Sequence, residues 1–441
     1  MDTIFAVASG LQRAGVTIIR VSGPAALLTY KNLTHRPVPP PRLAVFGSFR
    51  VPETGKLLDR GMMLFFEGPH SFTGEDVVEY HVHGGLAVVR GFLDVLARQP
   101  ECRLAAPGEF TRRAFENGKM DLTAAEAVAD LIDAETEAQR VQALDQLGGN
   151  LARLYEGWAD TLKRILAHQE ADIEFPDEDM PAHLSDKLKP EIIALVKEMK
   201  LHLDDKRRGE RLRNGALVAI LGAPNAGKSS LLNALVRRDV AIVSEEAGTT
   251  RDVIEVHLDL GGYPVILADT AGLRATESKI EAEGIRRAHK LADEADIKVV
   301  LFDGTQAPDA ETLAVVDDNT IIVLTKADQV KTPADKTVAE RKALWLSSST
   351  GAGLDALLKV LTEKTAALFT APRNGPSLTR ERHRQALGQT VASLDRCLTA
   401  ALPELAAEDL RLALRSLGAV TGTIHVEELL DTIFKDFCIG K

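Results

Sequence analysis

Cysteines and long apolar runs are scarce in this sequence. Three cysteines occur, Cys102, Cys397 and Cys438, at spacings that fit neither a disulfide framework nor a zinc site. His81 and His83 alternate along a predicted strand, but two histidines alone make a poor metal site, which favours a structural role. No apolar run approaches the roughly 20 residues that span a bilayer, and no basic segment followed by an apolar core opens the chain. We therefore expect a cytoplasmic protein with no membrane partner.

An excess of basic residues is also absent. The chain has 53 Lys and Arg against 64 Asp and Glu, a formal net charge of −11. Nonspecific binding to nucleic acid depends on clustered Lys and Arg, so any RNA contact of this protein must be local. Hydrophobic residues make up 45% and charged residues 27% of the chain, which is the composition of ordinary globular protein.

The length predicts several domains, because 441 residues exceed what one hydrophobic core usually serves. Up to about residue 118, short apolar runs alternate with Pro and Gly, and one helical stretch covers residues 86–97. Apolar residues then recur at three- and four-residue steps over 120–171 and 191–203, which predicts helices. The expected fold is multidomain: an α+β N-terminal domain (1–118), an all-α helical domain in two parts (119–213 and 373–441) and an inserted α/β P-loop G domain (214–372).

Within 214–372, apolar strands alternate with helical stretches, as in an open, mainly parallel sheet. Residues 254–260 instead alternate apolar with polar side chains, which is typical of a half-exposed edge strand. The basic run 206–213 in front of this region predicts a solvated helix end. Buried strands are expected at 216–221, 265–268, 298–302, 320–324 and 343–346.

A phosphate-binding loop lies between a predicted strand and a helix expected to start near Ser230. Residues 222–229 match the pattern G-x-x-x-x-G-K-S. Its glycines let backbone amides curl around the β-phosphate, Lys228 reaches the β and γ oxygens, and Ser229 can ligate magnesium. Strand, loop and helix together favour a nucleotide site over a chance match.

Three later segments are expected to contact the γ-phosphate or the base of the bound nucleotide. Segment 269–272 follows a strand and directs Asp269 toward magnesium and the Gly272 amide toward the γ-phosphate. Segment 325–328 ends in Asp328, whose carboxylate can accept from both guanine N1–H and N2–H, a donor pair that adenine lacks. Thr325 stands where the usual motif has Asn, so an amide brace to the phosphate loop is missing or replaced by a hydroxyl. Segment 347–349 suits the loop whose backbone amide meets guanine O6.

These segments, with several blocks outside the G domain, resemble the bacterial tRNA modification GTPases of the MnmE (TrmE) family. Other bacterial GTPases share the G domain but neither the N-terminal blocks nor the C-terminal Cys-Ile-Gly-Lys. The resemblance extends over essentially the whole length, through residues 20–23, 71–76, 83–85, 107–110, 117–122, 248–252 and 438–441.

The resemblance implies a potassium-stimulated GTPase that lacks an arginine finger and is activated when two G domains meet. It assigns Mg²⁺ to Ser229 and Thr250, and the water-positioning role to Glu281, with Glu277 and Glu283 as nearby alternatives. The implied K⁺ ligands are Asn225, Ser244, Glu246 and Thr249. The expected GTP-binding residues are Asn225, Ala226, Gly227, Lys228, Ser229, Ser230, Ser244, Glu245, Glu246, Ala247, Gly248, Thr249, Thr250, Asp269, Thr270, Ala271, Gly272, Thr325, Lys326, Ala327, Asp328, Ser347, Ser348 and Ser349.

The N-terminal domain resembles folate-binding one-carbon domains, and the implied folate contacts are Arg20, Glu79, Lys119 and Lys441. A carboxylate can accept from the pterin's amino and N3 hydrogens, and basic side chains can meet glutamate carboxylates. Without the resemblance, Arg20 and Lys119 would be interpreted as surface charges. Cys438 is expected near this site, either catalytic as a nucleophile or acid/base or a structural or solvent-facing thiol.

The resemblance implies a GTPase that, with an FAD-dependent partner resembling MnmG, adds an aminomethyl or carboxymethylaminomethyl group to C5 of the wobble uridine of certain tRNAs. The one-carbon source would be 5,10-methylene-tetrahydrofolate. FAD and NADH would belong to the partner, because this chain has no dinucleotide fingerprint. The implied assemblies are a homodimer and a heterotetramer with that partner. An alternative is a regulatory or ribosome-assembly GTPase without modification chemistry; a P-loop kinase is opposed by the Asp328 motif.

Overall fold

The computed structural model of the chain describes residues 2–10, 12–174, 184–238, 240–242, 254–269, 290–330, 337–370, 375–424, 427–435 and 437–440. The chain divides into two compact units. The first unit comprises Met1–Ala129, Leu147–Lys163 and Leu414–Lys441; the second comprises Asp130–Gln146 and Arg164–Ala413. In the described part of the chain, none of the helices has the length and apolar character needed to cross a bilayer.

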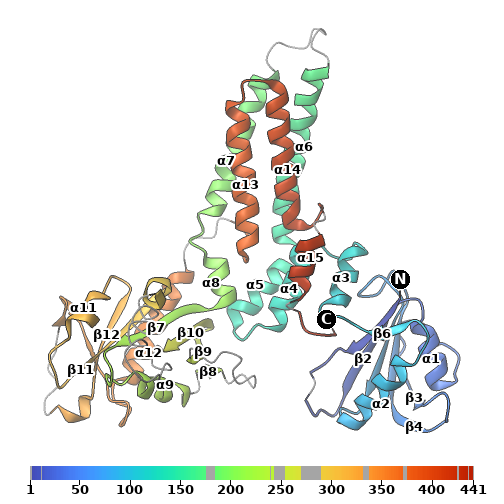
Figure 1. Cartoon of the computed structure of the whole chain (residues 1–441), viewed down its shortest axis with the longest axis horizontal. Coiled ribbons are helices and arrows are strands. Elements are labelled where there is room, and N and C mark those ends of the chain that lie inside the picture. The colour runs from blue at the N-terminus through green and yellow to red at the C-terminus, as the bar shows by residue number, and fades with distance from the viewer. Residues whose placement is uncertain are drawn as a thin grey trace, which may run out of the picture. The chain divides into compact units, whose positions relative to one another are not determined.

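A six-stranded sheet forms the centre of the first unit (Figure 1, blue). Its order is β3-β4-β5-β2-β1-β6, and all neighbours are antiparallel except β1 and β6. Successive side chains point to opposite faces of a strand, so the sheet has two chemically different faces. The strands are β1 (Thr3–Val7), β2 (Thr17–Ser22), β3 (Val45–Arg50), β4 (Leu57–Phe66), β5 (Val77–Val82) and β6 (Cys102–Leu104).

Helices α1 (Ala26–Thr34) and α2 (Leu86–Ala97) contribute to the core on one face of this sheet. The rings of Phe49, Tyr80 and Phe92 pack there, with Phe49 5.4 Å from Tyr80 and 5.3 Å from Phe92 between centroids. The helix predicted over 86–97 is confirmed with the same bounds. A second core joins helices α3 (Glu109–Glu116), α4 (Leu122–Ile132) and α15 (Glu427–Lys435).

A seven-stranded sheet with the order β15-β12-β11-β7-β10-β9-β8 forms the G domain in the second unit. Strands β15, β12, β11, β7 and β10 are parallel, and β9 and β8 complete the sheet in antiparallel pairing. Alternate residues of β7 belong to two different hydrophobic cores. Val218 and Ile220 pack in the core that contains α9 (Lys228–Val236) and α12 (Leu354–Phe369). Ala219 and Leu221 pack in the core on the other side of the sheet. This two-sided burial explains the continuous apolar runs in the sequence. The strands are β7 (Ala216–Gly222), β8 (Ala241–Ile242), β9 (Ile254–Leu260), β10 (Tyr263–Asp269), β11 (Ile297–Asp303), β12 (Thr320–Thr325) and β15 (Leu344–Trp345), beside a small pair, β13 (Thr337–Val338) and β14 (Arg341–Lys342).

Two expectations from the sequence are wrong in detail. Strand β9 is not the sheet edge, because Ala241 and Ile242 of β8 pair with it. The basic run 206–213 is not a solvated helix end, because most of it forms helix α8 (Arg208–Asn214), in which Arg208 is buried. Arg211 lies 2.6 Å from Asp296, so part of this run is held by carboxylates, whereas Lys206 and Arg207 are exposed.

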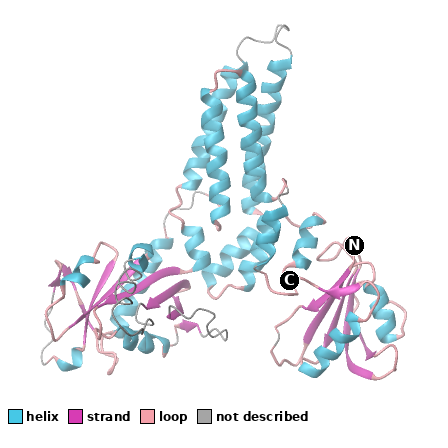
Figure 2. Ribbon diagram, viewed as in Figure 1, coloured by secondary structure: helices cyan, strands magenta, loops and turns pink. Residues whose placement is uncertain are grey.

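Helices before and after the G domain pack together, which confirms that the G domain is inserted. Arg384 donates to Glu210 at 2.8 Å and to Asp205 at 2.6 Å, although the whole G domain separates these residues in sequence. In the second unit, α7 and α13 run side by side (Figure 2). The remaining helices are α5 (Glu137–Leu147), α6 (Asn150–Glu174), α7 (Leu184–Leu203), α9 (Lys228–Val236), α11 (Ala310–Ala314), the 3₁₀ turn η2 (Ala327–Gln329), α12 (Leu354–Phe369), α13 (Glu381–Thr399) and α14 (Pro403–Thr421).

Candidate nucleotide and one-carbon sites

The predicted nucleotide segments meet at one edge of the seven-stranded sheet. Because β7, β10, β11 and β12 are parallel, their last residues, Gly222, Asp269, Asp303 and Thr325, lie along the same edge. Open α/β sheets bind their ligands outside the carboxyl ends of the strands. The fold therefore gathers segments that are up to about a hundred residues apart in sequence, as expected for a single nucleotide site.

The phosphate loop runs from the end of β7 into α9, which begins at Lys228, earlier than predicted. Gly222 has φ +148, and a Cβ there would lie 2.5 Å from the carbonyl oxygen of Leu301, so no larger residue fits. The Lys228 ammonium donates to the carbonyl oxygens of Gly222 at 2.7 Å and Ala223 at 3.0 Å. A cation is thus held beside backbone amides at a helix N-terminus, an arrangement that suits phosphate.

Thr325 braces the phosphate loop with its hydroxyl. Its Oγ1 donates to the carbonyl oxygen of Ala226 at 2.8 Å and lies 3.2 Å from that of Phe302, and the residue is 2% exposed. The sequence left open whether the contact of the usual Asn side chain with the phosphate loop is lost or is made by a hydroxyl. The structure shows that the Thr325 hydroxyl makes it. A direct hydrogen bond therefore joins the phosphate loop to the predicted base-recognition segment.

The predicted base-recognition residues lie close together. Ser347 donates its hydroxyl to Asp328 Oδ1 at 2.6 Å, and its oxygen is 2.9 Å from that of Ser349. The hydrogen bond from Ser347 lowers the pKa of Asp328, which keeps this carboxylate an acceptor. Lys326 lies 2.7 Å from Asp303. Burial opposes ionisation of Asp303, but hydrogen bonds from Lys326 and Thr305 prevail and lower its pKa to about 2.

In the first unit, Arg20 and Glu79 are opposite each other on β2 and β5. Arg20 Nε donates to Glu79 Oε1 at 2.9 Å, and the two side chains are 18% and 15% exposed. The guanidinium carbon of Arg20 lies 5.3 Å from the ring centroid of Phe72 and 5.7 Å from that of Phe110. Neither charge is a freely solvated surface group; both belong to a half-buried polar strip flanked by aromatic rings.

His81 extends this strip along β5. Its Nε2 is buried, lies 3.7 Å from Glu79 Oε2 and has no hydrogen-bond partner among the described residues. His83, beyond the end of the strand, bonds Asp59 through Nδ1 at 2.9 Å. The two histidines thus lie in different surroundings, and the unsatisfied nitrogen of His81 leaves one buried position for a polar ligand group.

Lys119 is held by the loop that follows β4. Its ammonium donates to the carbonyl oxygen of Pro69 at 2.8 Å. Asn117 donates to the carbonyl oxygen of Thr73 at 2.7 Å, and the Thr73 hydroxyl lies 2.7 Å from that of Ser22, close to Arg20 in β2. A chain of hydrogen bonds therefore connects the Lys119 segment with the Arg20 strand.

The C-terminal segment docks beside β1. Ile439 forms a backbone bridge with Pro107, and Gly108 N donates to the carbonyl oxygen of Cys438 at 3.3 Å. A Cβ on Gly440, where φ is +101, would lie 1.9 Å from the carbonyl oxygen of Val7. Cys438 itself is exposed. Burial raises the pKa of the Cys102 thiol and that of the Cys397 thiol to about 11.

Comparison with known proteins covers both units. Residues 3–119 match the family described as GTP-binding protein TrmE N-terminus, and residues 122–438 match the MnmE helical domain. The chain is 53% identical over 444 residues to the tRNA modification GTPase MnmE of Paramagnetospirillum magneticum, with 100% of both chains covered. The chain belongs to the MnmE family.

Other relatives agree over the full length. Identity is 52% over 445 residues to the tRNA modification GTPase MnmE of Parvibaculum lavamentivorans, covering 100% of both chains. It is 45% over 470 residues to a mitochondrial 5-taurinomethyluridine tRNA synthase subunit of Danio rerio, covering 100% of this chain and 93% of the relative. This chain is accordingly a GTP-binding GTPase that acts in tRNA modification.

Several predicted site residues lie outside the described residues, so their assignments stay predictions. The side chain of Asp269 is also outside the description, although its backbone ends β10. The residues concerned are Ser244, Glu245, Glu246, Ala247, Gly248, Thr249, Thr250, Thr270, Ala271, Gly272, Glu277, Glu281, Glu283 and Lys441.

Sequence reasoning missed three contributors to these sites. Asp303 anchors Lys326, and its position at the end of an apolar strand was the available signal. Phe72 and Phe110 flank Arg20 from two distant segments. No pattern in the sequence indicates that pairing, because it depends on how two loops fold over one face of the sheet.

Proposed function

We propose that this chain acts with an FAD-dependent partner resembling MnmG to add an aminomethyl or carboxymethylaminomethyl group to C5 of the wobble uridine of certain tRNAs. A tetrahydrofolate derivative, 5,10-methylene-tetrahydrofolate, supplies the one-carbon unit. The name of the Danio rerio relative supports this proposal, since it describes a subunit of an enzyme that makes a 5-substituted uridine in tRNA. We also propose a homodimer, a heterotetramer with the partner, and a cytoplasmic location alongside the tRNA substrate.

The observation that carries the folate proposal is the Arg20–Glu79–His81 strip. Its carboxylate can accept from the amino and ring N–H groups of a pterin, and the unsatisfied Nε2 of His81 offers one further polar contact. Phe72 and Phe110 supply apolar surface beside it. In this proposal Lys119 and Lys441 meet the glutamate tail of the folate.

In the G domain, the proposed cation ligands are Ser229 and Thr250 for Mg²⁺ and Asn225, Ser244, Glu246 and Thr249 for K⁺. Asn225 adopts φ +64, in the left-handed region where Asn is among the tolerated residues. A K⁺ ion held by these residues would supply the positive charge that an arginine finger supplies in other GTPases. Glu281 is proposed to position the attacking water.

Glu79→Gln tests the folate proposal against a regulatory GTPase without modification chemistry. The substitution exchanges an acceptor oxygen for a donor, so affinity for methylene-tetrahydrofolate should fall about tenfold, or roughly 1.4 kcal/mol. GTP turnover should stay unchanged. Glu53→Gln, at an exposed position of the same unit, is the matched control. If wild-type protein fails to bind the folate, or Glu79→Gln binds as tightly as Glu53→Gln, the regulatory alternative is favoured.

A further inference from the structure

The hairpin formed by β9 and β10 connects the nucleotide edge with the segment Asp130–Gln142. At one end of the hairpin, Ile254 pairs with Asp269. In sequence, Thr250 and the segment 251–253 directly precede β9, and Thr270–Gly272 directly follow β10. In the sequence, the predicted magnesium ligand Thr250 and the predicted γ-phosphate segment ending at Gly272 therefore flank the same end of this hairpin.

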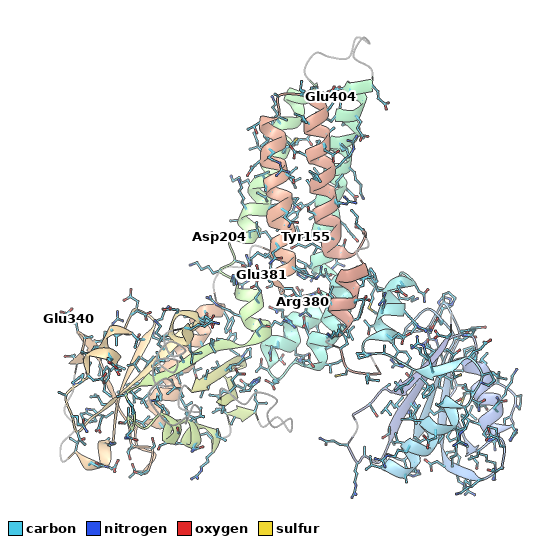
Figure 3. The ribbon with its side chains drawn as sticks, in the orientation of Figure 1. Tyr155, Asp204, Glu340, Arg380, Glu381 and Glu404 are labelled. Atoms are coloured by element: carbon cyan, nitrogen blue, oxygen red, sulfur yellow. The ribbon has the colours of Figure 1, made fainter. Side chains whose placement is uncertain are left out.

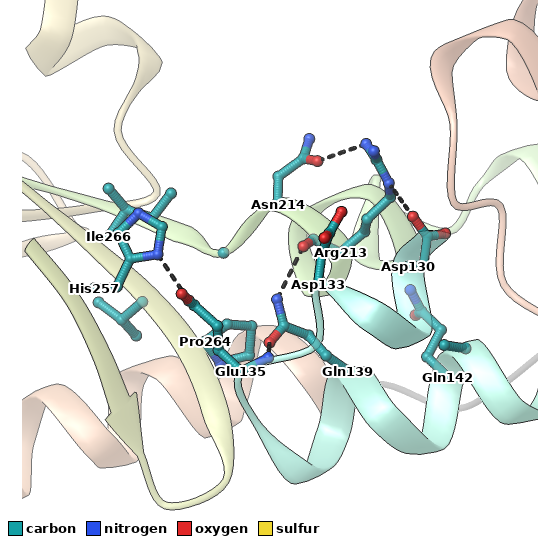
Figure 4. Close-up of a pocket in the computed structure, with 13 residues that line it drawn as sticks. Asp130, Asp133, Glu135, Gln139, Gln142, Arg213, Asn214, His257, Pro264 and Ile266 are labelled. Atoms are coloured by element: carbon teal, nitrogen blue, oxygen red, sulfur yellow. Dashed lines mark hydrogen bonds and ion pairs between the residues drawn. The ribbon is translucent and has the colours of Figure 1, made fainter. Parts of the chain in front are cut away.

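The hairpin is hydrogen-bonded to the helical part of the second unit. His257 Nδ1 lies 2.7 Å from Glu135 Oε2, and His257 pairs with Ile266 in the middle of the hairpin. At the turn, the carbonyl oxygen of Gly262 accepts from the amide of Ala138 at 3.1 Å. Figure 4 shows Glu135 reaching from the helical segment to His257. A displacement of the hairpin would thus act directly on residues 135–138.

The same helical segment is tied to the two connections of the G domain. Asp130 Oδ1 accepts from Arg213 Nε and from Arg380 Nη2, each at 2.8 Å. Arg213 precedes β7, and Arg380, labelled in Figure 3, directly precedes α13. Gln139 Nε2 donates to the carbonyl oxygen of Arg213 at 3.0 Å. Helix α5 and its preceding loop are therefore fixed to the chain on both sides of the G domain as well as to the hairpin.

A cavity of about 290 Å³ lies between this segment and the hairpin. Asp133 and Gln142 are among its lining residues, and Gln142 Oε1 is buried without a hydrogen-bond partner among the described residues. If the hairpin and the helical segment were closely packed here, a shift of one would be transmitted to the other over a broad surface. Across the cavity, the hydrogen bond between Glu135 and His257 instead joins two of the lining residues directly, as Figure 4 shows.

We infer that Glu135 and His257 are positioning residues for tRNA modification, which couple the nucleotide edge of the seven-stranded sheet to the helical domain through the β9–β10 hairpin. This inference rests on the proposed function for its readout. Because neither side chain belongs to the phosphate loop or the base-recognition segment, their loss should spare nucleotide binding. It should reduce the number of tRNA modifications obtained for each GTP hydrolysed.

The test uses the full chain with its FAD-dependent partner and measures modified wobble uridine, GTP turnover and GTP affinity on the same samples. Glu135→Ala and His257→Ala should each lower modification per GTP about fivefold, and the double variant no further, since both break one contact. GTP affinity should stay within about twofold of wild type. Glu137→Ala is the matched control, because Glu137 is exposed and pairs only with Arg140 of its own helix turn among the described residues.

Glu135→Gln separates a positioning role from general destabilisation. A glutamine keeps an acceptor oxygen for His257, so modification per GTP should recover to within about twofold of wild type. Additive losses in the double variant, or equal ratios for Glu135→Ala and Glu137→Ala, would overturn the inference. Absence of modified wobble uridine with wild-type protein would instead contradict the proposed function, so the two failures are distinguishable.

Discussion

The two candidate sites are built in opposite ways. The nucleotide site lies at the edge of a parallel sheet, where each contribution is a short continuous segment after a strand, such as Lys228 after β7 or Asp328 after β12. The one-carbon site lies on the face of an antiparallel sheet, where Arg20 and Glu79 meet through strand register. A loop site can be recognised from contiguous motifs, whereas a face site depends on which strands become neighbours.

The comparison predicts that the two sites can be inactivated separately. Lys228→Ala should lower GTP affinity and turnover by at least about 100-fold, or roughly 2.7 kcal/mol, because the only lysine of the phosphate loop is lost. Binding of methylene-tetrahydrofolate should not change. Isothermal titration with each ligand measures both effects. A parallel loss of folate affinity would show that the two sites are not independent.

Cys438→Ser tests the candidate one-carbon site, as Lys228→Ala tests the nucleotide site. If this exposed thiol takes part in the one-carbon step, tRNA modification should fall by roughly 30-fold, since a serine hydroxyl stays protonated where a thiol ionises. GTP turnover and the melting temperature should stay close to wild type, because the side chain is not part of a core. Nucleoside analysis of tRNA provides the measurement. Full modification by this variant would leave Cys438 a structural or solvent-facing thiol.

Asn225→Ala tests whether the loop site includes a monovalent cation. GTP hydrolysis in potassium should exceed hydrolysis in sodium about tenfold for wild type, equivalent to roughly 1.4 kcal/mol of transition-state stabilisation. In the variant most of that difference should disappear. Asn233→Ala, at an exposed position of α9 that is assigned to neither the nucleotide nor a cation, is the control. An unchanged potassium response in Asn225→Ala would reject the proposed cation site.

The smallest predicted effect concerns the brace inside the loop site. Thr325→Val keeps the shape of the side chain but removes the hydroxyl that donates to Ala226. Losing this buried hydrogen bond should cost about 1 kcal/mol and weaken GTP affinity about fivefold. Thr325→Ser retains the hydroxyl and should bind GTP within about twofold of wild type. Equal affinities of the Val and Ser variants would contradict the bracing role.

Much of the G domain could be predicted because its signals are local. The strands at 216–221 and 320–324 were located to within a residue, since both faces of a parallel sheet are buried and the runs are continuously apolar. Alternation along β9 and the charge run 206–213 did not predict their surroundings correctly. A two-residue partner strand leaves no pattern of its own, and carboxylates supplied by distant segments cannot be seen from the charge run that they neutralise.

The phosphate loop, the guanine specificity expected from Asp328 and the family of the chain could be inferred from the sequence. Each of these inferences rests on short stretches of residues that are adjacent in the chain. Three features could be seen only in the tertiary structure. The Thr325 hydroxyl donates to the carbonyl oxygen of Ala226, and His81 keeps an unsatisfied nitrogen beside Glu79. Asp130 binds both Arg213 and Arg380. These contacts join residues from 2 to 250 positions apart. Their geometry follows from strand register and helix packing, which depend on the burial of apolar surface across the whole fold.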